Sequence, residues 1–227
     1  MKAVILLSGG LDSTVCMSVA KKKGYELYPM SFRYGQRHSR ELTSAQQVAD
    51  YYGAKKHLII DTNMQDIGGS ALTDEHIAVP KGDVERTGIP ITYVPARNLI
   101  FLSYALAYSE VVGAESIFIG VNALDFSGYP DCRPEFIEKF QQLADYSTKA
   151  VTQDQRHITI QTPLQYLSKK EIVLLGTQNE APLDLTTSCY NGGDEACGVC
   201  DSCLLRLKGF AEAGLTDPIA YQHGRSE

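Results

Sequence analysis

The sequence lacks an apolar run long enough to cross a bilayer, and no small-residue cleavage site follows its first apolar segment. A membrane-spanning helix needs about 20 predominantly apolar residues, whereas the opening "MKAVILLSGG" holds a much shorter run. Such a start is typical of a first β-strand rather than of a signal peptide. We therefore expect a cytoplasmic protein with no membrane partner.

The sequence also lacks an excess of basic residues. It has 21 Lys and Arg against 27 Asp and Glu, for a net charge of −6. Proteins that clamp a nucleic-acid backbone usually present a basic face, so the charge argues against direct nucleic-acid binding. The run Lys21 to Lys23, followed by Gly24, is instead typical of a helix C-terminus.

Internal repeats and low-complexity tracts are missing as well. The 227 residues, 44% hydrophobic and 21% charged, suit one large domain with a small appendage. We predict a main α/β domain over residues 1–182 and a cysteine-rich segment over residues 183–227. Within the first, residues 62–97 show little periodicity and are interpreted as a long lid or interface loop.

Short apolar runs alternate with helical patterns along the main domain. Strands are expected at residues 3–7, 27–32, 57–60, 116–121 and 157–160, and helices at 13–23, 39–52, 98–112, 134–151 and 168–176, with a further helix at 204–213. This alternation predicts a doubly wound five-stranded parallel sheet covered on both faces. Its ligand crevice should lie at the carboxyl ends of the strands.

Three polar, glycine-containing segments should meet at that crevice. They are "LLSGGLDST" after the first strand, "SFRYGQRH" at the second and "GVNALDFSGYPDCRPEF" after the fourth. Tyr34, Gln36, Arg37 and His38 would then lie near a bound ligand, although an exposed turn explains them equally well.

The first of these segments has the composition of an anion-binding loop. Gly9 and Gly10 let the backbone turn tightly, and the following helix offers its positive N-terminal end. Hydroxyls of Ser8, Ser13 and Thr14 can donate to phosphate oxygens, and Asp12 can hold Mg²⁺. The segment lacks both the Walker A ending and the G-x-G-x-x-G spacing. A plain strand–helix turn capped by Ser13 remains the alternative.

Four of the six cysteines cluster near the end of the sequence, with the spacing Cys189-x7-Cys197-x2-Cys200-x2-Cys203. In a cytoplasmic protein such clustering indicates a metal rather than disulfides, and four thiolates suit a closed tetrahedral zinc site. An iron–sulfur cluster is the alternative, but Leu207 stands where a ferredoxin-type run has its fourth cysteine. Cys16, on the first helix, is interpreted as a small buried hydrophobe.

The run "SGGLDS" resembles the pyrophosphate loop of the N-type ATP pyrophosphatases, which cleave ATP between the α and β phosphates and transfer AMP to a substrate oxygen. This resemblance implies ATP, with Mg²⁺, as the bound nucleotide. It assigns the contacts with the departing pyrophosphate to Leu7, Ser8, Gly9, Gly10, Leu11, Asp12, Ser13 and Thr14.

The whole chain resembles one family within that group, the 7-cyano-7-deazaguanine synthases of queuosine biosynthesis. The resemblance rests on "LLSGGLDST", "SFRYGQRHSRE", "VPARNLIFLSYA", "GVNALDFSGYPDCRPEF" and "SCYNGGDEACGVCDSCLLR". It implies an adenine nucleotide alpha hydrolase-like fold with a C-terminal zinc site of four cysteines, and a homodimer. Two positions depart from the pattern: Arg33 in "FRYGQ", and Ala96 where glycine is frequent.

The resemblance implies an ATP-dependent ligase that converts 7-carboxy-7-deazaguanine and ammonia into the nitrile by two adenylations. We expect Asp12, Ser13, Arg97 and Arg133 to be catalytic. Asp131, Arg133 and Tyr129 are expected to bind the substrate. As alternatives, Asp131 caps the helix that starts at Pro134, the arginines form surface ion pairs, and Tyr129 belongs to the core or the rim.

Two other function classes use the same features differently. In a tRNA thiolase with a pyrophosphate loop, the cysteines would hold an iron–sulfur cluster or carry sulfur. In a non-catalytic zinc module, the glycine loop would be merely structural. The acidic charge counts against the first, and ATP-dependent release of pyrophosphate would exclude the second.

Overall fold

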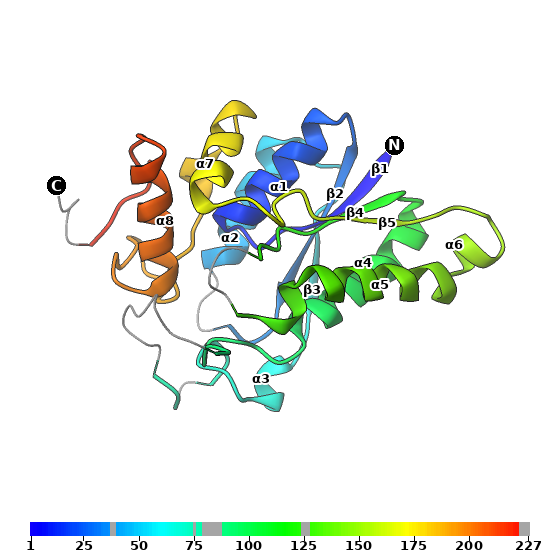
Figure 1. Cartoon of the computed structure of the whole chain (residues 1–227), viewed down its shortest axis with the longest axis horizontal. Helices are drawn as coiled ribbons and strands as arrows, with labels where there is room; N and C mark the ends of the chain where they lie inside the picture. The colour runs from blue at the N-terminus through cyan, green and yellow to red at the C-terminus, as the bar shows by residue number, and fades with distance from the viewer. Residues whose placement is uncertain (37–39, 75, 79–87, 124–127, 223–227) are drawn as a thin grey trace.

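The computed structural model describes residues 1–36, 40–74, 76–78, 88–123 and 128–222, and Figure 1 shows its central sheet with helices on both sides. The strands are β1 (Lys2–Leu6), β2 (Glu26–Arg33), β3 (Leu58–Asp61), β4 (Ser116–Phe118) and β5 (Thr159–Gln161). They are all parallel, in the order β3-β2-β1-β4-β5. The predicted doubly wound five-stranded parallel sheet is confirmed.

Helices cover both faces of this sheet (Figure 1). The helices on one face are α1 (Leu11–Lys22), α2 (Arg40–Tyr51) and α7 (Lys169–Gln178), and those on the other are α4 (Arg97–Val112) and α5 (Pro134–Ser147). Shorter elements are α3 (Met64–Ile67), α6 (Lys149–Thr152), η1 (Pro130–Cys132) and η2 (Leu183–Leu185), and α8 (Asp201–Glu212) packs beside α7. None of the described helices is both long and apolar enough to span a bilayer.

The central strand β1 contributes side chains to both hydrophobic cores, one on each face of the sheet. Ala3 and Ile5 point into the core under α1, α2 and α7, whereas Val4 and Leu6 point into the core under α4 and α5. This alternation follows from the two-residue period of a strand. Burial on both faces explains why the run is almost wholly apolar.

The end of α1 confirms the reading of the Lys21 to Lys23 run. Lys21 and Lys22 occupy the last turn of the helix, where cations complement its dipole. Gly24 then takes a φ of 81°, a left-handed conformation that glycine adopts without steric cost.

The single helix predicted over residues 134–151 is wrong. Helix α5 ends at Ser147, and Thr148 takes extended angles (φ −111°, ψ 146°). The Thr148 hydroxyl oxygen accepts a hydrogen bond from the Val151 amide at 3.4 Å and so begins the separate helix α6. Threonine competes for backbone groups in this way, and its preference for the N-cap position overrides the apolar period.

Two other helix starts also differ from the sequence expectation. Helix α1 begins at Leu11, with Gly10 as N-cap and no side-chain cap, so Ser13 lies inside the helix and is not its N-cap residue. Helix α8 begins at Asp201 rather than Leu204, directly after Cys200. Helix α1 therefore starts directly after the glycine loop, and helix α8 starts directly after one of the clustered cysteines.

Candidate active site

A cavity of about 360 Å³ opens at the carboxyl edge of the sheet, within the usual range for a small-molecule site. It lies where the strand order reverses between β1 and β4, the switch point at which ligands bind in such sheets. Its lining includes residues that follow β1, β2 and β4: Leu7, Ser8, Gly10, Asp12, Tyr34, Gln36, Gly120, Val121 and Asn122. The predicted convergence of the three segments is confirmed, while Arg37, His38 and residues 124–127 lie outside the described residues.

Part of the 62–97 stretch also borders this cavity. Leu72, Pro90 and Thr92 are among its lining residues. The Ala71 amide donates to the Ile91 carbonyl at 2.9 Å, which joins the two described parts of the stretch. Residues 75 and 79–87 lie outside the described residues, and a role as lid or interface stays a prediction.

The glycine loop needs its first glycine for two reasons. Gly9 has a φ of 85°, and a Cβ there would lie 2.2 Å from the Glu41 carbonyl oxygen and 2.7 Å from the Ala45 amide nitrogen. Only glycine lets the start of α2 pack so closely against the loop. The first amides of α1, which have no acceptor within the helix, then follow at once and can face an anion.

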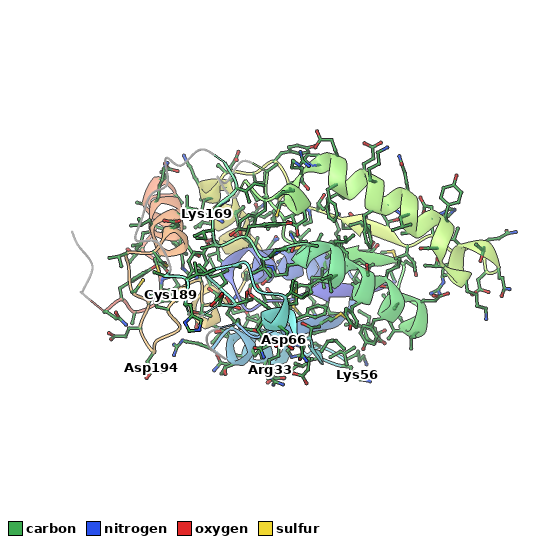
Figure 2. All side chains as sticks on the ribbon, turned by 90° about the horizontal axis from the view of Figure 1, so that it is seen from below. Arg33, Lys56, Asp66, Lys169, Cys189 and Asp194 are labelled. Carbon is green, nitrogen blue, oxygen red and sulfur yellow. The ribbon has the colours of Figure 1, made fainter. Side chains whose placement is uncertain are left out.

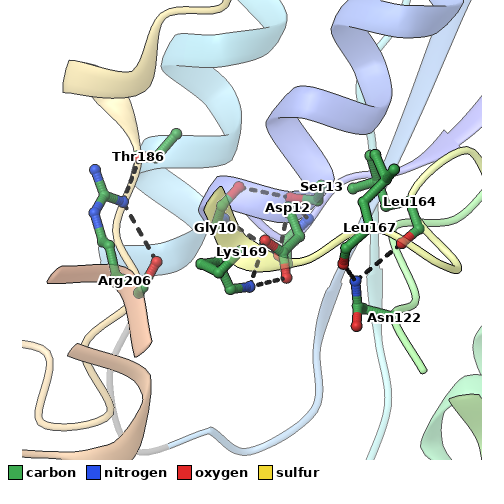
Figure 3. A network of polar contacts seen from close by, with 11 residues as sticks. Gly10, Asp12, Ser13, Asn122, Leu164, Leu167, Lys169, Thr186 and Arg206 are labelled. Carbon is green, nitrogen blue, oxygen red and sulfur yellow. Dashed lines mark hydrogen bonds and ion pairs between the residues drawn. The ribbon is translucent and has the colours of Figure 1, made fainter. Parts of the chain in front are cut away.

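Hydroxyl groups of Ser13 and Ser8 give the loop its shape, and Figure 3 shows the contact between Ser13 and Gly10. The Ser13 hydroxyl donates to the Gly10 carbonyl at 3.0 Å and accepts from the Ser8 amide at 3.2 Å. The Ser8 hydroxyl oxygen in turn accepts from the Gly10 amide at 3.2 Å. The loop is thus held in one conformation by its own side chains.

The eight predicted loop contacts do not all reach the cavity. Six of the residues line it: Leu7, Ser8, Gly10, Leu11, Asp12 and Ser13. Gly9 lies behind them against α2, and Thr14 is fully buried, with no hydrogen-bond partner for its hydroxyl among the described residues. Contact with the nucleotide stays a prediction for all eight.

Asp12 is paired with a lysine that the sequence reasoning missed. Lys169 Nζ lies 2.8 Å and 2.9 Å from the two carboxylate oxygens of Asp12, and the lysine side chain is only 13% exposed. Such a shielded, bidentate pair is stronger than an exposed one. A signal for it existed: Lys169 opens a helix after the fifth strand, where the helix dipole disfavours a cation unless an anion is near.

Arg97 reaches the cavity from the first residue of α4. Its Nη1 donates to the Tyr34 hydroxyl at 3.2 Å, and its guanidinium lies 5.7 Å from the centroid of the Tyr34 ring. Burial raises the pKa of Tyr34 to about 12, so this phenol stays neutral. Tyr129 also lines the cavity and shares a 2.9 Å hydrogen bond with Thr92.

Asp131 and Arg133 are not among the residues that line the cavity. Asp131 is buried, and its Oδ2 accepts from the Asn98 amide at 2.9 Å, so it caps the start of α4 and not the helix at Pro134. Arg133 is exposed, and its Nε donates to the Pro130 carbonyl at 3.1 Å. Direct contact of either residue with a substrate stays a prediction.

The four clustered cysteines come together as the spacing predicted. Their sulfur atoms all lie within 4.8 Å of one another, and all four residues are buried. In a tetrahedral zinc site with Zn–S bonds of about 2.3 Å, the sulfurs are about 3.8 Å apart, and Cys197 Sγ lies 4.0 Å from Cys203 Sγ. The donor set and its dimensions therefore fit a structural zinc ion.

Backbone amides around Cys189 favour its thiolate. The amides of Asn191 and Cys197 donate to Cys189 Sγ at 3.4 Å and 3.3 Å. Hydrogen bonding to Cys200 and Cys203, together with these amides, holds the pKa of Cys189 well below its usual range. Only thiolates bind a metal, so this arrangement suits coordination.

The cysteine-rich segment also forms one wall of the cavity, which the sequence reasoning did not foresee. Its lining residues are Thr187, Ser188, Tyr190, Asp201, Ser202, Leu205 and Arg206. In Figure 2, Cys189 and Lys169 lie toward the same end of the molecule, whereas Arg33 lies at an outer edge. Arg33 there pairs with Asp61 in an exposed ion pair, away from the cavity lining.

The family model for "Queuosine biosynthesis protein QueC" matches residues 2–214. The match spans the sheet, the cavity and all four clustered cysteines. The chain belongs to this family. The alternative of a tRNA thiolase is not favoured by this membership.

Relatives within the QueC family match over nearly the whole chain. A 7-cyano-7-deazaguanine synthase of Desulfitobacterium hafniense is 63% identical over 221 residues, which cover 97% of this chain and 93% of the relative. One of Acetivibrio thermocellus is 60% identical over 220 residues, 97% of each chain. A solved structure, described as a predicted subunit of tRNA methyltransferase from Methanocaldococcus jannaschii, is 19% identical with a TM-score of 0.48, covering 78% of this chain and 74% of that one.

Proposed function

We propose that the protein is an ATP-dependent 7-cyano-7-deazaguanine synthase. It converts 7-carboxy-7-deazaguanine, ammonia and two ATP into 7-cyano-7-deazaguanine, two AMP and two pyrophosphates. The observation that carries this proposal is the "SGGLDS" loop at the mouth of the cavity, in a chain that the QueC model matches over residues 2–214.

The first half of the reaction makes an amide. A carboxylate oxygen of the substrate attacks the α-phosphorus of ATP, and the bond from that phosphorus to the bridging oxygen breaks, so pyrophosphate leaves. Ammonia then attacks the acyl carbon of the adenylate and loses a proton, and AMP leaves with the former carboxylate oxygen. Adenylation is needed because a carboxylate has no leaving group that ammonia can displace.

The second half makes the nitrile with the same chemistry. The carboxamide oxygen attacks the α-phosphorus of a second ATP, and pyrophosphate leaves again. The nitrogen then loses its protons while AMP departs with the oxygen, which forms the carbon–nitrogen triple bond. Because both halves activate an oxygen by AMP transfer, one cavity serves both.

The loop's part is to hold the leaving pyrophosphate and to stabilise charge at the α-phosphate. The first amides of α1 are the donors. The Ser8 and Ser13 hydroxyls would join them by turning their protons from Ser13 Oγ and the Gly10 carbonyl toward the phosphate. Lys169 supplies a fixed positive charge beside Asp12, and Asp12 is the group that would hold Mg²⁺ bound to ATP. A cation that already lies in the cavity wall needs little rearrangement to meet a phosphate.

The substrate would be held on the side of the cavity opposite the loop. Arg97 and Tyr129 are placed in its lining and can contact the substrate carboxylate and the ring face. Asp131 and Arg133 keep their proposed roles at the heterocycle edge and the carboxylate. If Arg133 contacts the carboxylate, Arg133→Gln should weaken the carboxylate substrate more than the neutral carboxamide.

We assign the cysteine cluster to a structural Zn²⁺. Cys189, Cys197, Cys200 and Cys203 would be its four ligands, which leaves no open position for catalysis. Bound there, zinc supplies folding free energy to the segment. Elemental analysis of the purified protein should give one zinc and no iron per chain.

The expected homodimer, the cytoplasmic location and the lack of direct nucleic-acid binding also belong to this proposal. The dimer follows from the family resemblance, the lack of nucleic-acid binding from the net charge of −6, and the location from apolar runs too short to span a membrane. Sedimentation at micromolar concentration, with and without a tRNA, tests the dimer and the absence of RNA binding together.

The decisive experiment supplies the intermediate. With one equivalent of ATP and no ammonia, the carboxamide of 7-deazaguanine should give the nitrile, AMP and pyrophosphate, detected by mass spectrometry. The control is the carboxylate without ammonia, which should give no nitrile. An inert carboxamide, in a preparation that converts the carboxylate with ammonia, would show that the two-adenylation route is wrong.

A further inference from the structure

Arg206 is the largest fully buried side chain of the described residues, with 1% of it exposed. A buried guanidinium is tolerated only when its donors are paired. Nε and Nη2 donate to the two carboxylate oxygens of Asp217 at 2.7 Å and 2.9 Å. This bidentate pair balances the positive charge of Arg206, but the other N–H donors of its guanidinium need acceptors elsewhere.

The remaining donors of Arg206 all go to residues 183–188. Nη1 donates to the Thr186 hydroxyl oxygen at 2.7 Å and to the Ser188 hydroxyl oxygen at 3.4 Å, and Nη2 donates to the Leu183 carbonyl at 3.1 Å. Figure 3 shows the contact between Arg206 and Thr186. One side chain of α8 thus fixes this segment at three points.

The same segment lies against the glycine loop. The Thr187 amide donates to the Gly9 carbonyl at 3.0 Å. A Cβ added to Gly10 would lie 3.4 Å from the Thr187 carbonyl oxygen. Because Thr187 holds the Gly9 carbonyl, the position of the segment helps to decide how the loop presents its amides.

Arg206 also lies next to the metal ligands along the chain. It follows Cys203 by one turn of α8, and Ser188 directly precedes Cys189. Asp217 is held from a third side by the Tyr221 hydroxyl, which donates to its Oδ2 at 2.7 Å. The guanidinium therefore joins residues 183–188 to the chain around Asp217, and both of its partner segments lie close in sequence to the cysteines or to the contact with Gly9.

We propose that Arg206 is a positioning residue for the nucleotide. Through Thr186 it holds residues 186–188 so that Thr187 fixes the Gly9 carbonyl before ATP binds. The inference rests on the proposed function, because it assumes that the loop binds ATP. A loop that is ordered before ATP binds loses less conformational entropy on binding. Loss of the hydrogen bond between Arg206 and Thr186 should therefore weaken ATP binding.

Thr186→Val is the sharpest probe. It removes the hydroxyl that Arg206 contacts and keeps the side-chain volume, and Thr186 is buried without lining the cavity. The variant loses two hydrogen bonds, the one that the hydroxyl accepts from Arg206 at 2.7 Å and the one that it donates to the Leu183 carbonyl at 2.6 Å. We expect the Kd for ATP, measured calorimetrically, to rise about tenfold. In the absence of ATP, the amides of residues 7–10 should exchange hydrogen faster in Thr186→Val than in the wild type. The metal content of the two proteins should be the same.

Two further variants separate positioning from general stability. Thr177→Val is the control for the same chemical change at an exposed position, because its hydroxyl donates to the Val173 carbonyl within α7 at 3.0 Å and has no contact with Arg206. It should leave ATP affinity and loop exchange unchanged. Thr186→Ser keeps the hydroxyl and should bind ATP like the wild type. Should Thr186→Val fail to fold, Arg206→Lys, which keeps the positive charge beside Asp217, replaces it with the same expectations.

The outcomes are distinct. If wild-type protein binds ATP and Thr186→Val binds it equally well with unchanged loop exchange, the positioning role is wrong and the proposed function stands. If wild-type protein binds no ATP, the proposed function is wrong and the inference falls with it.

Discussion

Lys169 Nζ contacts both carboxylate oxygens of Asp12, at 2.8 Å and 2.9 Å. Replacing the lysine leaves the Asp12 charge without this partner in the wall of the cavity and removes the cation expected to meet phosphate. We expect Lys169→Met to lower kcat about 100-fold or more. Rapid-quench measurement of AMP formation tests this.

The two residues should act as a unit, so their effects should not add. Asp12→Asn combined with Lys169→Met should be little worse than either single variant. Lys170→Met, at the adjacent exposed position of α7, is the control and should keep near-normal activity. Additive losses would place the two side chains in separate steps.

Ser13→Ala should disorganise the glycine loop. The hydroxyl donates to the Gly10 carbonyl and accepts from the Ser8 amide, and both contacts are lost together. We expect a loss of about 1 kcal/mol in the free energy of unfolding and loss of AMP formation. Urea titration and product analysis give the two quantities, and normal turnover in a folded variant would remove Ser13 from the mechanism.

Cys200→Ser should lower metal content and stability together, because metal binding contributes folding free energy. The expected result is less than one metal per chain and a lower urea midpoint. Cys16→Ser is the matched control: Cys16 is fully buried on α1, so the variant loses stability but keeps its metal. A metal-free Cys200→Ser protein as stable as the wild type contradicts a structural role.

Ala96→Gly should stabilise the protein. Ala96 has a φ of 55° and a ψ of 21°, a left-handed conformation that costs an alanine about 1 kcal/mol or more. Glycine recovers most of this, offset by about 0.5 kcal/mol of added unfolded-state entropy. Ala211→Gly, at an exposed position within α8, should have the opposite sign, and thermal unfolding of both variants decides.

His57 should make stability pH-dependent. Burial lowers its pKa, and the Asp50 charge only partly opposes this. The unfolded chain therefore binds the proton more readily, so this contribution is complete above a pH of about 6.5 and is lost as the pH falls through the folded-state pKa. His57→Gln should flatten the dependence of the unfolding free energy between pH 7.5 and pH 5; an unchanged slope would assign it to other groups.

The features predictable from the sequence are the local ones. The apolar run of β1, the turn at Gly9 and Gly10 and the spacing of Cys197, Cys200 and Cys203 lie within a few residues, where chain geometry leaves few alternatives. Family resemblance added Arg97 and Tyr129, both of which reach the cavity lining.

The features that escaped prediction depend on distant residues or on single side chains. Lys169 and Asp12 are 157 positions apart, and no periodicity links them. The break at Thr148 comes from one hydroxyl that captures a backbone amide inside a convincing helical pattern. The hydrogen bond from the Asn98 amide on α4 to the Asp131 carboxylate also escaped prediction, because only the tertiary fold brings the two residues near.

The hydrogen bond from the Thr187 amide to the Gly9 carbonyl has a consequence for biosynthesis. The glycine loop is synthesised among the first residues of the chain. Thr187, which fixes it, is synthesised much later, together with the clustered cysteines. A nascent chain arrested before Thr187 would carry the entire "SGGLDS" sequence and lack the contact that orders it. The full nucleotide affinity of the loop would then arise only late in translation, after residues 183–188 have packed against it.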